Sequence, residues 1–312
     1  MHRLPVRQLI ALSGIACLEV IRQPITLLLM VTCTVLTILN PMLVIYPFGE
    51  VGKLPRDSAL AFQLGFGLLV AAYGACTTLS REVESGTASA VLSKPVSREN
   101  FFFSKFLGMV AVIVIYSLCS ILATQLNQMI SHELRDHALL ALLPLTPVAG
   151  LLAAAVINYT TRRPFVTVAF ASVLVCLALT TGALAYGMHG GFQWRIVPAN
   201  VLITFALIVL AAIAITLSTR LRTAPTIMIC SAVLVLGLVS DFLFGRFTDE
   251  NWWGTIPYML LPNWQHFWVT DGLTGGGSVP WTYVLNAGGY AVLYAAGVLA
   301  IGTLCFRWTD VQ

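Results

Sequence analysis

Side chains that could take part in chemistry are scarce in this chain, and the densest group of them lies in one short segment, residues 81–98. Charged residues make up only 10% of the 312 residues, against about 25% in an ordinary soluble domain. The segment reads Arg-Glu-Val-Glu-Ser-Gly-Thr-Ala-Ser-Ala-Val-Leu-Ser-Lys-Pro-Val-Ser-Arg and stands between two long apolar runs. Acidic and basic groups in this alternation suit docking to a soluble partner through charge complementarity.

The pattern within this segment predicts a short helix followed by a stop. Between residues 81 and 93 only Gly86 disfavours a helix. Pro95 would end this helix, and Ser97 could cap the next one, which would begin at Arg98. The short helix would lie across the membrane surface, with its charged side toward a partner. Its apolar face would consist of Ala88, Val91 and Leu92.

Two other sites contain residue types that could bind a metal or take part in chemistry, but the evidence for them is weaker. The run His132–His137 contains two histidines and two carboxylates, but a metal site would need further ligands, so we interpret the run as a polar turn. Asp241 is the one acidic residue within a predicted membrane span, where a carboxylate is costly and often functional. It lies near the end of its helix with Arg246 close in sequence, so an interfacial ion pair is the simpler interpretation.

Motifs for catalysis are absent from the sequence. It has no Gly-x-Ser-x-Gly elbow, no His-Glu-x-x-His and no phosphate-binding Gly-x-x-x-x-Gly-Lys loop. We therefore expect no catalytic residue, no metal and no cofactor in this chain, and we expect that it is not an enzyme. Its seven cysteines are scattered without a Cys-x-x-Cys pair, so neither a disulfide framework nor a zinc site is indicated.

The apolar runs predict a helical membrane protein. The chain is 58% hydrophobic with a mean hydropathy of +0.87, which is too apolar for a soluble surface. A helix needs roughly 20 apolar residues to span the hydrocarbon layer, and no strand-like alternation suggests a barrel. We predict one polytopic domain over 1–312 with eight transmembrane helices at 25–46, 59–79, 106–129, 138–159, 164–187, 197–219, 225–245 and 282–306.

Segments outside the spans have predictions of their own. Residues 1–22 lack the features of a signal peptide and are expected to form an amphipathic surface helix, the alternative being a soluble tail. The outer loop 246–280 is expected to lie at the membrane interface. Pro144 and Pro147 should kink the fourth span. The apolar face of the surface helix would consist of Leu9, Leu12, Ala16 and Val20.

The distribution of basic residues predicts the orientation. Twelve lysines and arginines fall in one set of loops and five in the opposite set. By the positive-inside rule, both termini and the segment 81–105 would be cytoplasmic. Six of the seven tryptophans fall on the predicted outer side, at headgroup level.

The segment 81–105 resembles the cytoplasmic coupling segment of ABC-2 type transporter permeases. These proteins typically show Glu-x-x-x-Gly-Thr, then Leu-Ser-x-Pro-Val-Ser-Arg, then a lysine entering the next helix. Further resemblances are Leu217–Pro225 to the family's cytoplasmic hairpin, Leu261–Phe267 to its outer-face element and Phe306–Asp310 to its C-terminal ending. The first pattern is present at Glu82, Gly86, Thr87, Leu92, Ser93, Pro95, Val96, Ser97, Arg98 and Lys105.

The resemblance implies the membrane-spanning permease subunit of an ATP-driven exporter in the bacterial cytoplasmic membrane. It implies two permease protomers, as a homodimer or a pseudo-symmetric heterodimer, and two copies of a separate ATPase subunit that hold ATP and Mg²⁺. The residues it assigns to ATPase coupling are Arg81, Glu82, Glu84, Gly86, Thr87, Leu92, Pro95, Arg98 and Lys105.

Some points stay open from the sequence. Many family members have six spans, so the pair at 138–187 is surplus; we expect it at the periphery, with the protomers meeting through the first two spans. An assembly or recruitment factor without transport is an alternative function. A secondary transporter is another, although the spans offer almost no ionisable residues for ion coupling. No residue pattern names the substrate.

Overall fold

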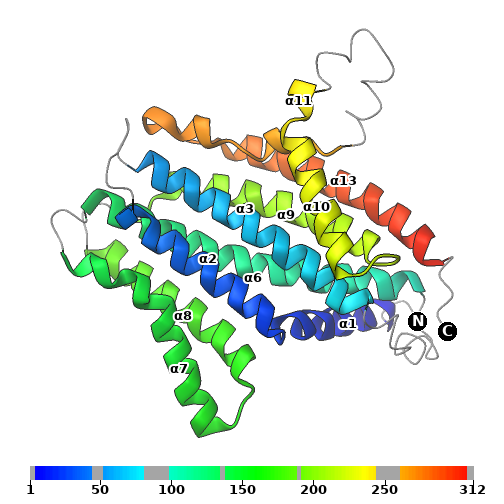
Figure 1. Cartoon of the computed structure of the whole chain (residues 1–312), viewed down its shortest axis with the longest axis horizontal. Helices are drawn as coiled ribbons and strands as arrows, with labels where there is room; N and C mark the ends of the chain where they lie inside the picture. The colour runs from blue at the N-terminus through cyan, green and yellow to red at the C-terminus, as the bar shows by residue number, and fades with distance from the viewer. Residues whose placement is uncertain are drawn as a thin grey trace.

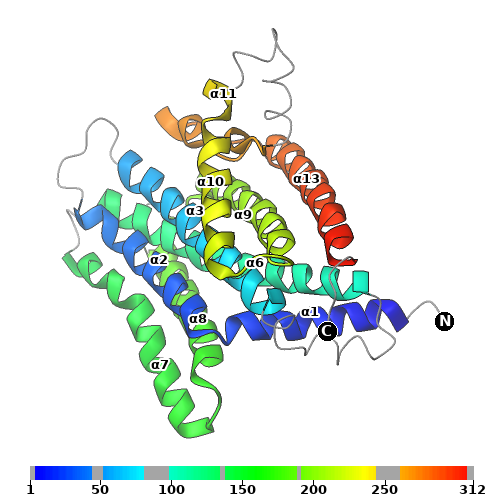
Figure 2. The same ribbon diagram turned by 45° about the vertical axis from the view of Figure 1, so that its right-hand side comes forward.

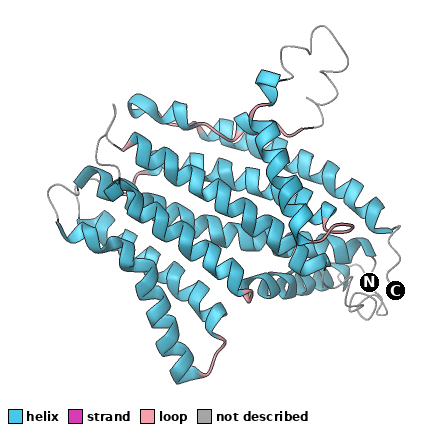
Figure 3. Ribbon diagram, in the orientation of Figure 1, coloured by secondary structure: helices cyan, strands magenta, loops and turns pink. Residues whose placement is uncertain are grey.

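The computed structural model describes residues 4–43, 52–80, 98–133, 138–187, 191–243 and 261–307, which are mostly helical and contain no strand (Figures 1 and 3). The α-helices are α1 (Leu4–Ile21), α2 (Pro24–Leu43), α3 (Lys53–Ala75), α6 (Arg98–Glu133), α7 (Thr146–Thr161), α8 (Phe165–Gly187), α9 (Val197–Leu217), α10 (Thr223–Leu238), α11 (Ser240–Leu243) and α13 (Trp281–Arg307). Shorter 3₁₀ helices cover Ala138–Leu145, Trp194–Ile196, Trp264–His266 and Thr270–Gly276, and a π-helical turn covers Cys76–Ser80.

The predicted all-α membrane fold is confirmed. Within the described part of the chain, seven helical stretches are long and apolar enough to cross a membrane. They comprise α2, α3 with its π-helical turn, α6, α7, α8, α9 and α13. The described ends of the chain, Leu4 and Arg307, lie at the same end of the bundle (Figures 1 and 2).

The predicted seventh span, 225–245, is not one continuous helix. Helix α10 has 16 residues, about 24 Å at 1.5 Å per residue, which is shorter than the hydrocarbon layer of about 30 Å. It ends at Val239, whose φ of −100° and ψ of 2° leave the helical region, and the short α11 follows. The indole N–H of Trp264 donates to the Val233 carbonyl at 3.2 Å, and its ring packs against Gly237. The aromatic ring thus occupies the side of the last turn of α10.

The fourth span also differs from its prediction, because prolines begin its helix instead of kinking it. Residues Ala138–Leu145, including Pro144, form a 3₁₀ helix, and α7 starts only at Thr146. Pro147 stands in the first turn of α7, where its missing N–H has no helical partner to lose. The fourth candidate span, Leu142–Thr161, thus consists of 3₁₀ turns followed by a helix of 16 residues.

Helix α6 is the central element of the bundle. It packs against α1, α2, α3, α8, α9 and α13, and no other described helix has as many neighbours (Figure 1). Its 36 residues correspond to about 54 Å, well beyond the hydrocarbon thickness. The first turns of α6 lie beside α1 and the end of α13 (Figure 2).

Helix α1 packs against α6 through the face that was predicted to enter the membrane surface. Ala16 and Val20 are fully buried, and Gly108 of α6 lies so close that a Cβ there would be 2.6 Å from the Cβ of Ala16. The opposite side of α1 exposes other large apolar residues, Ile10 and Ile15. One face of α1 therefore packs against α6 and a second apolar face is exposed, while its position along the membrane surface stays a prediction.

The hairpin of α7 and α8 lies at the edge of the bundle in the single chain (Figure 1). Only 22% and 28% of the residues in their apolar stretches are buried, against 67% for α3. The two helices approach each other closely where Gly150 faces the backbone of Val173. Helix α3 leaves little free surface in the single chain, and the dimer contact expected through the first two spans stays a prediction.

Candidate functional site

Most predicted coupling residues lie outside the described residues, namely Arg81, Glu82, Glu84, Gly86, Thr87, Leu92 and Pro95. The helix predicted over residues 81–93 therefore stays a prediction. The structure does describe the elements on both sides of this segment. The described residues before it end with the π-helical turn at Ser80, and those after it begin with α6 at Arg98, where a helix start was predicted.

A π-helical turn ends the helix that precedes the segment. At Cys76–Ser80 the helix of α3 widens, a feature that often marks functional sites. The hydroxyl groups of Thr77 and Thr78 are buried, and each donates to the carbonyl of Gly74 at 3.0 Å. These side chains satisfy a carbonyl near the point where the regular helix pattern changes.

Lys105 lies at the other side of the segment and is turned into the protein. It is 4% exposed, and its Nζ lies 3.0 Å from Oε2 of Glu19 on α1. The same Nζ lies 5.5 Å from the centre of the Phe101 ring. Both contacts stabilise an ammonium group that has lost its water. Lys105 therefore ties α6 to α1, and any part it has in coupling acts through that helix.

Aromatic rings join the start of α6 to the end of α13 at the same place. The ring of Phe306 lies 6.2 Å from that of Phe101 and 6.0 Å from that of Phe102. All three rings are buried. We call Glu19, Phe101, Phe102, Lys105 and Phe306 the Lys105 cluster.

The Lys105 cluster connects three helices at the entry point of the segment. Nearby on α1, burial raises the pKa of the Cys17 thiol, which keeps this thiol protonated and unreactive. Helix α9 is joined as well, because the hydroxyl of Thr216 donates to the carbonyl of Val298 on α13 at 3.3 Å. The start of α6, directly after residue 97, is thus held to both α1 and α13.

A layer of buried amide side chains lies inside the bundle, and sequence analysis missed it. Gln63 of α3 donates from Nε2 to the carbonyl of Asn200 on α9 at 3.2 Å. Tyr116 of α6 donates its phenolic hydrogen to the carbonyl of Gln63 at 2.9 Å. Thr124 of α6 donates to Oδ1 of Asn200 at 3.4 Å. Neutral hydrogen bonds of this kind connect helices where no water competes.

The same layer continues to α2. Nδ2 of Asn127 donates to the carbonyl of Thr37 at 2.7 Å, and Nε2 of Gln128 donates to Oδ1 of Asn127 at 3.0 Å. Both amides are buried. The sequence does carry a signal for this layer, since Gln125-Leu-Asn-Gln128 is a polar group within an otherwise apolar run. The layer joins α2, α3, α6 and α9 without a charged group.

The structure adds little evidence for the two other candidate sites, Asp241 and the run His132–His137. Asp241 lies in the short α11, after the break at Val239, and Arg246 lies outside the described residues, so their ion pair stays a prediction. In the run His132–His137, helix α6 continues through Glu133, and residues 134–137 lie outside the described residues. Among the residues described, no group of three or more metal-ligating side chains comes together.

The architecture is that of a multi-pass helical membrane protein with one central helix and a polar segment at one end. The sequence matches the family model described as ABC-2 family transporter protein over residues 17–246. The chain therefore belongs to the ABC-2 transporter family, which gives it a role in membrane transport. Membership also implies an ABC transporter system with an ATPase partner. No curated protein and no solved structure matches the chain.

Proposed function

We propose that this chain is the permease subunit of an ATP-driven ABC-2 exporter in the bacterial cytoplasmic membrane. In this proposal two permease protomers form the translocation path, and each binds one copy of a separate ATPase through residues 81–105. The chain itself catalyses no reaction, and the ATPase subunits hold ATP and Mg²⁺. The export direction follows from the family alone.

One observation carries the coupling part of this proposal. The segment 81–97 runs directly into α6, which packs against most of the other long helices. A rigid helix that contacts its neighbours throughout transmits a displacement at its end to the whole bundle, which is how packed helices switch between discrete arrangements. The family match over residues 17–246 includes the entire segment.

The test of coupling is charge reversal within the segment. The double variant Glu84→Lys and Arg98→Glu should lose co-purification of the ATPase subunit, because reversed charges repel a complementary surface. The matched control reverses Arg162 and Arg163 to glutamate; both are exposed in the turn between α7 and α8. Retention of the ATPase by the first variant, with normal membrane insertion, would remove residues 81–105 from the interface.

The orientation has a separate test. In a cysteine-free background, Arg162→Cys and Ser278→Cys should react with an impermeant maleimide from opposite sides of the membrane. Both positions are exposed. Arg162 directly follows the end of α7, and Ser278 lies three residues before the start of α13. We expect Arg162→Cys to label from the cytoplasmic side because of the positive-inside rule. Labelling of both cysteines from one side would contradict the proposed map.

A further inference from the structure

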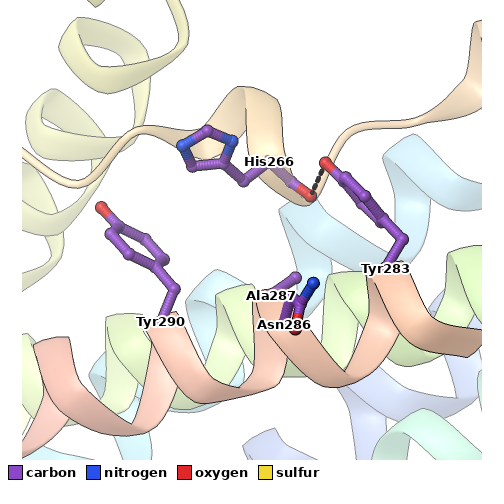
Figure 4. Close-up of a pocket in the computed structure, with 5 residues that line it drawn as sticks. All are labelled: His266, Tyr283, Asn286, Ala287 and Tyr290. Carbon is purple, nitrogen blue, oxygen red and sulfur yellow. Dashed lines mark hydrogen bonds between the residues drawn. The ribbon is translucent and has the colours of Figure 1, made fainter.

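An open pocket of about 210 Å³ lies between the first half of α13 and the 3₁₀ turn Trp264–His266 (Figure 4). Its lining residues are His266, Tyr283, Asn286, Ala287 and Tyr290. Pockets for drug-sized molecules measure about 300–1,000 Å³, so this one has room for a single small ring. Its walls belong neither to the Lys105 cluster nor to the amide layer.

Two tyrosines hold the pocket in shape. Tyr283 donates its phenolic hydrogen to the carbonyl of His266 at 2.9 Å, and the oxygen of Tyr290 accepts the backbone N–H of Asn263 at 3.2 Å. The tyrosines are seven residues apart, two turns along one side of α13, and the small Ala287 lies between them (Figure 4). The turn is therefore fixed over α13 at two points, with a gap between the rings.

Two polar side chains line this gap, those of His266 and Asn286. The amide of Asn286 and the imidazole of His266 have no hydrogen-bond partner among the described residues, and both side chains are exposed. The His266 ring is held edge-on to the Tyr290 ring, with 5.4 Å between their centres and an angle of 77°. Because Tyr290 accepts from Asn263, its own hydrogen is free to be donated outward.

The chemistry of the lining selects a ligand class. None of the five lining residues is an acid, a lysine or an arginine, so a charged ligand would find no counter-charge. An amide and an imidazole can donate and accept, which matches hydroxyl groups that do both. Aromatic faces carry negative charge density and attract the C–H bonds of a ring packed against them. We propose that this pocket binds a neutral, hydroxyl-rich ring of the size of one sugar.

Saturation-transfer NMR can test this on the full chain in lipid nanodiscs, with methyl α-glucopyranoside and methyl β-galactopyranoside as probes. We expect transfer to at least one glycoside. Asn286→Ala should weaken that binding roughly three- to tenfold, the value of one hydrogen bond. The control Thr282→Ala, exposed one turn earlier on α13 and outside the pocket, should bind as the unmodified protein does.

A second variant separates the pocket from a general effect on folding. Tyr283→Phe keeps the ring but removes the hydrogen bond to His266, so binding should weaken while the melting temperature changes little. Absence of transfer to both glycosides, or transfer that Asn286→Ala leaves unchanged, would overturn the proposal. Binding of tetramethylammonium in place of the glycosides would also overturn it, since an aromatic cage for a cation would then be present. These results do not depend on an ATPase partner.

Discussion

Glu19→Ala is expected to destabilise the protein by up to about 3 kcal/mol, because it removes the carboxylate 3.0 Å from the buried ammonium group of Lys105. This value is at the lower end for breaking a buried ion pair, since the Glu19 side chain is 30% exposed while that of Lys105 is 5% exposed. Thermal unfolding of the purified protein in detergent measures the change.

The double variant Glu19→Ala with Lys105→Met shows whether the pair itself is responsible. Methionine fills a similar volume without a charge, so the double variant should recover most of the stability that Glu19→Ala loses. Lys105→Met alone should cost less than Glu19→Ala, because the remaining carboxylate can reach water. A double variant no more stable than Glu19→Ala would mean that Lys105 tolerates burial without this partner.

Membrane class and helix positions could be predicted because they depend on local properties of the sequence. A run of about 20 apolar residues must be helical to satisfy its backbone in lipid, wherever it packs. The start of α6 at Arg98 followed from the capping rule in the same way. Such signals need no knowledge of neighbouring helices.

The direction of Lys105 could not be predicted, because it depends on a partner 86 residues away in the sequence. A lysine near the start of a span is normally counted as a cytoplasmic surface charge. Here α1 places Glu19 beside it, and the charge is neutralised inside the protein. The amide layer was missed for the same reason, since Gln63 and Asn200 meet only after α3 and α9 pack together.

The break after α10 also depends on a distant residue. The sequence from 225 to 245 is apolar enough to be interpreted as one span, and its one warning is Gly237. Near the end of the helix at Leu238, Trp264 from a later segment packs against that glycine and donates to the carbonyl of Val233. A side chain at position 237 would clash with the Trp264 ring, so glycine is needed for this contact. Sequence patterns within 225–245 do not reveal the contact, because Trp264 lies outside that stretch.

Gly108→Ala is expected to lift α1 away from α6 and to destabilise the protein by about 1–3 kcal/mol, the usual cost of overpacking. A Cβ at this position would lie 2.8 Å from the carbonyl oxygen of Ser13 and 2.9 Å from the backbone nitrogen of Cys17. These are backbone atoms, so no side-chain rotation relieves the clash and the whole helix must move. Gly14→Ala on α1 is the matched control, because nothing lies within 4 Å of a Cβ there.

The two substitutions should change stability in opposite directions. Gly14→Ala places a better helix former in an open position and should stabilise by up to about 1 kcal/mol, whereas Gly108→Ala should lower the melting temperature. If the melting temperature of Gly108→Ala equals or exceeds that of Gly14→Ala, α1 does not pack against α6 as described.

Combining Gly108→Ala with Glu19→Ala adds a further test. Gly108 is three residues after Lys105 on α6, so one displacement of α1 would break both contacts. The combined loss should therefore be smaller than the sum of the two single losses.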